Sequence, residues 1–153
     1  MKNDKIIKAL NTLIIINNDR IAGYETALNA TEEPDLKDLF SQFILTSQEN
    51  KEKLIEGVKS LGGNVIADAL PSGKFFRLWI DVRATLLSKD RIAILNSCDY
   101  GEDTAKDTYD DAILNEFKNL CSKHKTMIMA QKSSLNADHL SIKSMRDALI
   151  LIK

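Results

Sequence analysis

The chain has 153 residues and a formal net charge of −1, and its acidic and basic residues are interleaved, which excludes the basic stripe of a nucleic-acid-binding protein. Its length suits one domain, residues 1–153, with a sizeable hydrophobic core, and six glycines and two prolines give too few turn signals for a β-rich fold. The apolar run at residues 13–16 is too short to span a membrane, and no signal-peptide cleavage site follows it, so we expect a cytoplasmic protein that does not bind membranes.

Two long amphipathic helices are predicted in the first half of the chain, at about residues 4–29 and 34–61. In both segments apolar residues recur at alternating spacings of three and four, which is the pattern of a helix with one buried face. Pro34 suits the first turn of the second helix, and the pair Gly62 and Gly63 suits its end. Because the connection between the two helices is short, we expect them to be antiparallel neighbours.

A shorter amphipathic helix is predicted at about residues 72–87, in the connection that follows. Its apolar face carries Phe75, Phe76 and Trp79, and Trp79 is the only tryptophan of the chain. A face this apolar is unstable in water. It should therefore either pack along the bundle or form a contact between subunits.

Two further long helices are predicted in the second half, at about residues 89–114 and 116–150. The start of the last helix is ambiguous, because Asn115 and Ser122 both suit an N-cap. A connection of about 25 residues can return along the bundle and leave the second and third long helices parallel. The sequence therefore predicts an all-α, up-down-down-up four-helix bundle of ferritin-like topology, with one long crossover that carries a short extra helix.

Several motifs along the chain resemble a known family in their order and spacing. They lie at residues 13–25, 61–63, 72–74, 77–81, 94–103 with Tyr109, and 139–147. They resemble the small bacterial four-helix-bundle proteins of the ferritin-like superfamily that carry a domain of unknown function. This resemblance implies the fold, a distant kinship to ferritins and rubrerythrins, a homodimer and, by analogy, a role in stress adaptation. It does not imply an activity, because a fold does not determine a function.

The sequence lacks the metal-binding motifs of the best-known ferritin-like proteins. A di-iron bundle uses a Glu from each of two helices and a Glu-x-x-His pair from each of the other two. Of the two histidines, His124 follows Cys121 by three residues and His139 follows Asn136 by three, so we expect no standard di-iron centre and no cofactor. Cys98 and Cys121 also lack the CxxC spacing of a redox or metal motif, and we expect both to be reduced residues of the hydrophobic core.

Polar side chains interrupt the inward-facing stripes of the four long helices. These positions are Asn17, Tyr24, Ser47, Asn50, Glu102, Tyr109 and Gln131. One interpretation is that they form buried polar layers, which fix the pairing and register of the helices at some cost in stability. A buried carboxylate must then be paired, and the candidate donors to Glu102 are Asn17, Tyr24, Asn50, Arg20 and Arg146.

A second interpretation is that Glu102 is exposed and inert. A third is a reduced metal site in the bundle, in which one carboxylate from each of several helices and one histidine hold a single ion. Its candidate ligands are Glu102, Glu25, Glu49 and His139. Carboxylates and imidazole suit iron, manganese or zinc.

Two functional hypotheses follow from these interpretations. The first is a non-enzymatic helical protein that acts by association with itself or with a protein partner. The second is a metal-binding or oxidoreductase-like protein with its site around Glu102. The sequence indicates no reaction, so we favour the first.

Overall fold

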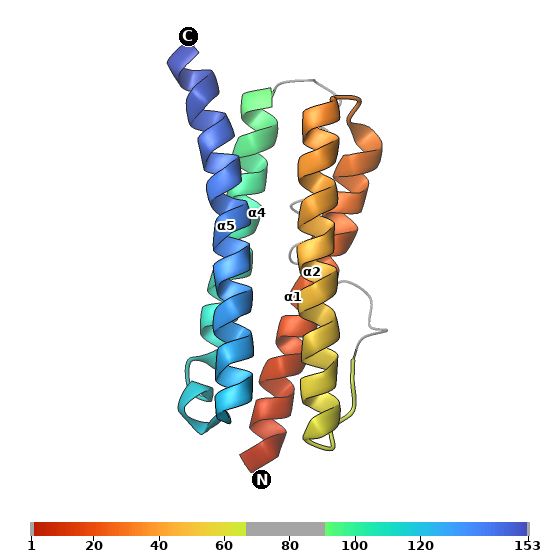
Figure 1. The fold of residues 1–153 in the computed structure, drawn as a ribbon, viewed down its shortest axis with the longest axis vertical. Coiled ribbons are helices and arrows are strands. Elements are labelled where there is room, and N and C mark those ends of the chain that lie inside the picture. Colours follow the sequence, from red (N-terminus) through yellow and green to blue (C-terminus); the bar gives the residue numbers. More distant parts are fainter. Residues whose placement is uncertain (1, 67–90, 153) are drawn as a thin grey trace.

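A computed structural model describes residues 2–66 and 91–152 of the chain (Figure 1). This part of the chain forms four long helices and one short 3-10 helix and contains no strand. The elements are α1 (Lys2–Ala30), α2 (Pro34–Ser60), α4 (Arg91–Ile113), η1 (Phe117–Asn119) and α5 (Ser122–Ile152). The expectation of an all-helical bundle is confirmed. The short helix expected at residues 72–87, with its aromatic face, lies outside the described residues.

The four long helices form a bundle in which each helix has two neighbours. α1 packs against α2 and α4, and α5 packs against the same two helices. In Figure 1, α1 and α5 run upward while α2 and α4 run downward, so every neighbouring pair is antiparallel. α2 ends at the lower end of the bundle and α4 begins at the upper end. This is the up-down-down-up order that the sequence predicts.

The end of α2 is fixed by two glycines in a Schellman motif. The backbone N–H of Gly63 donates to the carbonyl of Val58 at 3.0 Å, and that of Gly62 donates to the carbonyl of Lys59 at 3.0 Å. Gly62 has a φ of 76°, a left-handed conformation that favours glycine. A Cβ at Gly63 would lie only 2.8 Å from side-chain atoms of Ile7, so the missing side chain lets α1 approach. The prediction that this glycine pair ends the helix is confirmed.

The start of α5 differs from the prediction. The sequence places it at residue 116, whereas the helix begins at Ser122 and is preceded by the 3-10 turn η1. Leu120 has an extended backbone and is buried, and the first carbonyl to accept an α-helical hydrogen bond is that of Cys121, from the N–H of Lys125. The chain must reverse between α4 and α5, and the buried Leu120 ends that reversal. Asn115 is therefore not the cap, and Ser122 lies within one residue of it.

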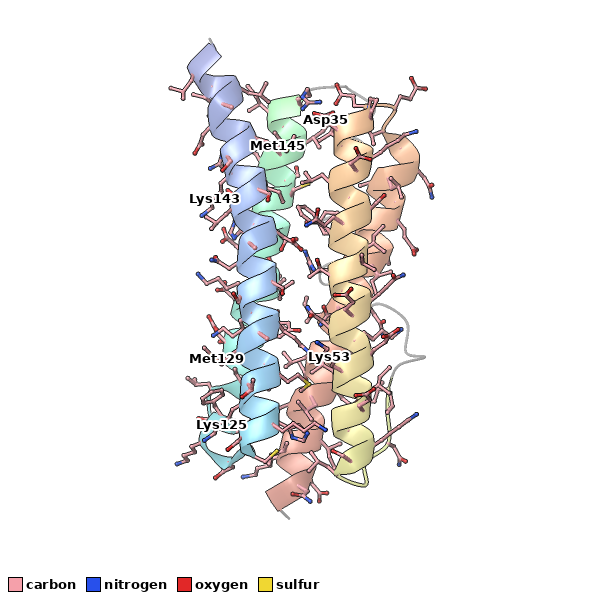
Figure 2. The ribbon with its side chains drawn as sticks, viewed as in Figure 1. Asp35, Lys53, Lys125, Met129, Lys143 and Met145 are labelled. Carbon is pink, nitrogen blue, oxygen red and sulfur yellow. The ribbon has the colours of Figure 1, made fainter. Side chains whose placement is uncertain are left out.

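The core is built from one apolar stripe on each long helix, as the periodicity predicts. Fully buried examples are Leu10, Leu13, Ile14, Leu36, Phe40, Leu54, Leu95, Ile128 and Ile142. Figure 2 shows this division along α5, where Met145 packs against the core and Met129 is exposed. Cys98 is buried as expected, but Cys121 is exposed. The prediction for Cys121 is wrong, because it stands at the turn before α5 rather than on a helical stripe.

Candidate functional site

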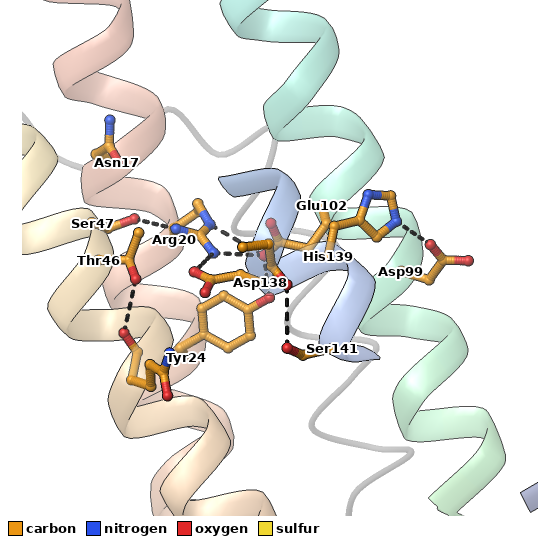
Figure 3. A network of polar contacts seen from close by, with 12 residues as sticks. Asn17, Arg20, Tyr24, Thr46, Ser47, Asp99, Glu102, Asp138, His139 and Ser141 are labelled. Atoms are coloured by element: carbon orange, nitrogen blue, oxygen red, sulfur yellow. Dashed lines mark hydrogen bonds and ion pairs between the residues drawn. The ribbon is translucent and has the colours of Figure 1, made fainter. Parts of the chain in front are cut away.

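A buried guanidinium lies at the centre of the bundle and contacts all the other long helices. Arg20, on α1, has no solvent exposure. Its Nε and Nη2 donate to Oε1 of Glu102 on α4, at 3.1 and 2.9 Å. Its Nη1 donates to the hydroxyl of Ser47 on α2 at 2.6 Å, and Nη2 also donates to Oδ2 of Asp138 on α5 at 3.3 Å (Figure 3). The guanidinium therefore joins four helices through one cation.

Tyr24 completes this layer from one turn further along α1. Its hydroxyl donates to the same oxygen, Oε1 of Glu102. Its ring lies 5.4 Å from the guanidinium carbon of Arg20, close enough for a cation–π contact. The ring also packs against Phe40 and Phe43, with centroids 5.6 and 5.0 Å away. Oε1 of Glu102 thus accepts three hydrogen bonds, two from the guanidinium and one from the phenol.

The electrostatics of this layer follow from its burial. Burial alone lowers the pKa of Arg20, but the nearby Glu102 and Asp138 raise it above its ordinary value, so the guanidinium stays charged. Burial, followed by the charge of Glu102, raises the pKa of Tyr24, so the phenol keeps its proton. Burial also raises the pKa of Asp138; Arg20 opposes this effect and Glu102 adds to it. One guanidinium therefore faces two carboxyl groups, and an ionised Asp138 leaves the layer with excess negative charge.

A second polar layer forms a closed ring of hydrogen bonds across the four helices. Nδ2 of Asn17 donates to the hydroxyl of Tyr109 at 2.8 Å, and this hydroxyl donates to Oε1 of Gln131 at 2.7 Å. Nε2 of Gln131 donates to the backbone carbonyl of Asn50 at 3.2 Å. Nδ2 of Asn50 donates to Oδ1 of Asn17 at 3.4 Å, which closes the ring. The structure thus brings four of the polar residues singled out in the sequence into one ring, as a register-fixing layer requires.

A third polar group lies between α4 and α5. Nε2 of His139 contacts Oδ1 of Asp99, and Nη1 of Arg146 donates to Oδ2 of the same carboxylate. Oδ1 of Asp103 lies 3.7 Å from Nε2 of His139. Burial tends to raise the pKa of Asp99, but the hydrogen bonds from His139 and Arg146 outweigh it and hold that pKa below its usual value. Ligand atoms of Asp99, Asp103 and His139 all lie within 4.8 Å of one another.

The four candidate metal ligands do not meet in the structure. Glu102 and His139 are buried, whereas Glu25 and Glu49 are exposed. Glu25 directly follows the inward residue Tyr24, and Glu49 directly precedes the inward residue Asn50. One helical step of about 100° turns each glutamate toward solvent. Within the described ranges, one group of three or more His, Cys, Asp or Glu residues has its possible ligand atoms close together. It consists of Asp99, Asp103 and His139.

Several functional groups of these layers were missed or only half identified from the sequence. Arg20 appears there as one of five candidate donors to Glu102, although it lies three residues after Asn17 and four before Tyr24, on the same inward stripe. Arg146 contacts Asp99 and not Glu102. Helical spacing carried the signal for Arg20. No periodicity could have singled out Asp99, because many aspartates of this chain lie at similar positions on a helix.

These features define an all-helical four-helix bundle with charged and polar layers in its core. The chain belongs to the family described as a domain of unknown function (DUF2383), whose family model matches residues 5–115. The matched range includes the buried side chains that α1, α2 and α4 contribute to both core layers. No curated protein matches the chain. Among residues 2–66 and 91–152, no helix combines the length and the apolar character needed to cross a bilayer.

Proposed function

We propose that this protein is a non-enzymatic helical bundle of ferritin-like ancestry, which acts in stress adaptation through association with a second copy of itself or with a protein partner. The position of Arg20 is the observation that supports the non-enzymatic part of this proposal. In a di-iron bundle, carboxylates and imidazoles from four helices converge on metal ions at the centre. Here carboxyl groups from α4 and α5 converge on a guanidinium instead.

A redox metal does not fit this core layer. Oε1 of Glu102 already accepts three hydrogen bonds, and Asp138 shares the same guanidinium. A divalent ion would have to displace a cation that is always charged and that is attached to α1.

Apolar side chains support the association part of the proposal. Large apolar residues are exposed on α4 and α5, and examples are Tyr100, Met129 and Leu140. The sequence also predicts an aromatic helical face at residues 72–87, which lie outside the described residues. Apolar surface that is not needed for the fold is typical of protein–protein contacts.

The mass of the purified protein in solution tests this proposal. We expect sedimentation equilibrium to give twice the mass of the 17.1 kDa chain, and Trp79→Ala to shift the equilibrium toward the monomer. Glu49→Ala, at an exposed polar position of α2, is the control and should leave the dimer intact. A wild-type protein that is monomeric at every concentration, with no partner bound, would contradict association.

Metal binding is the second candidate function, and the group between α4 and α5 favours it. Two carboxylates and a histidine suit a divalent ion such as zinc or manganese. Nη1 of Arg146 donates to Oδ2 of Asp99, and a hydrogen bond of this kind fixes the orientation of a carboxylate that binds a metal ion. We expect calorimetric titration with Zn²⁺ or Mn²⁺ to give one site per chain, lost in Asp103→Asn and kept in Asp107→Asn, an exposed control on α4. An absence of heat, with metal-free protein by elemental analysis, would exclude it.

A further inference from the structure

A cleft of about 350 Å³ lies between α4 and α5, beside the guanidinium layer. Its volume is in the range of small-molecule sites. The residues of its wall that matter here are Glu102, Lys106, Met129, Lys132, Leu135 and His139. Glu102, Leu135 and His139 are buried, whereas Lys106 and Met129 are exposed, so the cleft has an inner end and an outer rim.

Glu102, which contributes to the wall of the cleft at its inner end, has one carboxylate oxygen without a hydrogen-bond partner among the described residues. Glu102 is only 2% exposed, and its Oε2 is buried and receives no hydrogen bond from the part of the chain that the structure describes. Its other oxygen accepts all three donors from Arg20 and Tyr24. A buried acceptor that lacks a donor is unfavourable, so a donor or a cation at this end of the cleft would be stabilised.

The two ends of the cleft differ in charge. At the inner end lies the carboxyl group of Glu102, and Arg20, which pairs with it, also pairs with Asp138 in the core layer behind it. At the rim lie two lysines, Lys106 and Lys132. Within residues 2–66 and 91–152, Lys132 pairs with Asp110 at 2.6 Å and Lys106 has no ion pair. A purely anionic ligand would meet the carboxylate, and a purely cationic one would meet the lysines. A ligand that carries both charges complements both ends.

We propose that this cleft binds a small zwitterion with an apolar side chain, of the class of an apolar α-amino acid. Its ammonium group donates to Oε2 of Glu102, and its carboxylate pairs with Lys106 and Lys132. Its side chain packs on Leu135 and Met129, which form the apolar part of the wall. This inference goes beyond the proposed association and does not depend on it.

Calorimetric titration with L-leucine tests the proposal, and EDTA keeps divalent ions out of the measurement. Two matched probes carry one charge each: 3-methylbutylamine has the ammonium alone, and 4-methylpentanoate has the carboxylate alone. We expect saturable binding of L-leucine, and binding weaker by about tenfold or more for each probe, because each lacks a charge-assisted hydrogen bond. Equal binding of all three compounds, or no binding of L-leucine, L-isoleucine or L-methionine at millimolar concentration, would overturn the proposal.

Two variants locate the site. Glu102→Gln keeps a carbonyl oxygen for Arg20 and Tyr24 but places an amide donor where Oε2 stood, so binding of L-leucine should weaken by about tenfold or more. Lys106→Glu changes only the exposed rim, and it should weaken binding without a change in the circular-dichroism spectrum. Lys37→Glu, an exposed position on α2, should bind as the wild type does. Unchanged binding in Lys106→Glu would refute the site even if Glu102→Gln failed to fold.

Discussion

Two nitrogens of Arg20, Nε and Nη2, converge on a single oxygen of Glu102, at 3.1 and 2.9 Å. This differs from the side-by-side pairing in which an arginine contacts both oxygens of a carboxylate. The second oxygen, Oε2, accepts no hydrogen bond from the described residues. The pair is also fully desolvated, so its contribution to the fold depends on both partners being present.

Removal of Arg20 alone should be strongly destabilising. Arg20→Met retains much of the apolar stem but leaves Glu102 and Asp138 buried without their cation. We expect a loss of about 3–5 kcal/mol in the free energy of unfolding, as for other buried pairs that lose one partner. Urea unfolding followed by circular dichroism measures it.

The matched control for this prediction removes both charges. Arg20→Met combined with Glu102→Leu replaces the pair by apolar side chains, an exchange that is often neutral or stabilising. The double variant should therefore be more stable than Arg20→Met. If the two variants are equally unstable, the loss in the single variant reflects packing and not an unpaired charge.

The pKa of Asp138 predicts an unusual pH dependence. Burial raises this pKa in the folded protein above its value in the unfolded chain. The folded state therefore takes up a proton at higher pH than the unfolded state does, and the contribution of Asp138 to stability rises as pH falls through the folded pKa. At neutral pH the ionised group is unfavourable, so Asp138→Asn should raise the melting temperature by roughly 2–4 °C for each kcal/mol gained.

The contribution of Asp99 to stability should have the opposite pH dependence in the same experiment. Its pKa is lowered in the folded protein, so its stabilising contribution is present above the unfolded pKa and is lost as pH falls through the folded one. Asp99→Asn should therefore destabilise the protein at neutral pH and reduce its loss of stability in acid. Melting curves of both variants from pH 3 to pH 7, with EDTA present, separate the two effects. Parallel curves for wild type and both variants would contradict them.

Substitutions at the two glycines after α2 should lower stability for different reasons: backbone strain at Gly62 and a steric contact with Ile7 at Gly63. Gly62→Ala should cost about 1 kcal/mol, because alanine is strained at positive φ, and no change in α1 should relieve it. Gly63→Ala places a Cβ against Ile7, so Ile7→Ala should recover part of the loss in the double variant. Double-mutant analysis of the melting temperatures tests this coupling, and additive losses at Gly63 and Ile7 would contradict the contact.

The two cysteines should differ sharply in reactivity toward a thiol reagent. Cys121 is exposed, whereas Cys98 is buried, and burial followed by the charge of Glu102 raises the pKa of the Cys98 thiol. Since the thiolate is the reactive form, we expect one thiol per chain to react in the native protein and both in urea. Cys121→Ser should abolish the native reaction. Reaction of both thiols at similar rates without denaturant would contradict the burial of Cys98.

The sequence predicts which residues face inward far better than it predicts which of them meet. Helical periodicity identifies the face of Asn17, Tyr109 and Gln131, and the structure joins them in one ring. Periodicity says nothing of the axial position of one helix relative to its neighbours, so Glu102 had five candidate donors. Arg20 and Tyr24 fill that role.

The errors in the predicted site have physical causes at individual residues. Glu25 and Glu49 lie one helical step from an inward position, and this step is enough to expose them. Asp138 and His139 are consecutive yet both buried, because the buried side of α5 is wide. Asp138 reaches across the core to Arg20 of α1, and His139 contacts Asp99 on the neighbouring helix α4. A single stripe along α5 cannot represent both directions.

The guanidinium of Arg20 has a consequence for how the folded state responds to its surroundings. A metal ion at the centre of a bundle is a second component, and its occupancy falls when the concentration of free ion falls below the dissociation constant. Arg20 is part of the chain and keeps its charge at all ordinary pH values. Neither a chelator nor a scarcity of iron can remove the cation that joins these four helices, so this layer should persist when the supply of metal ions varies.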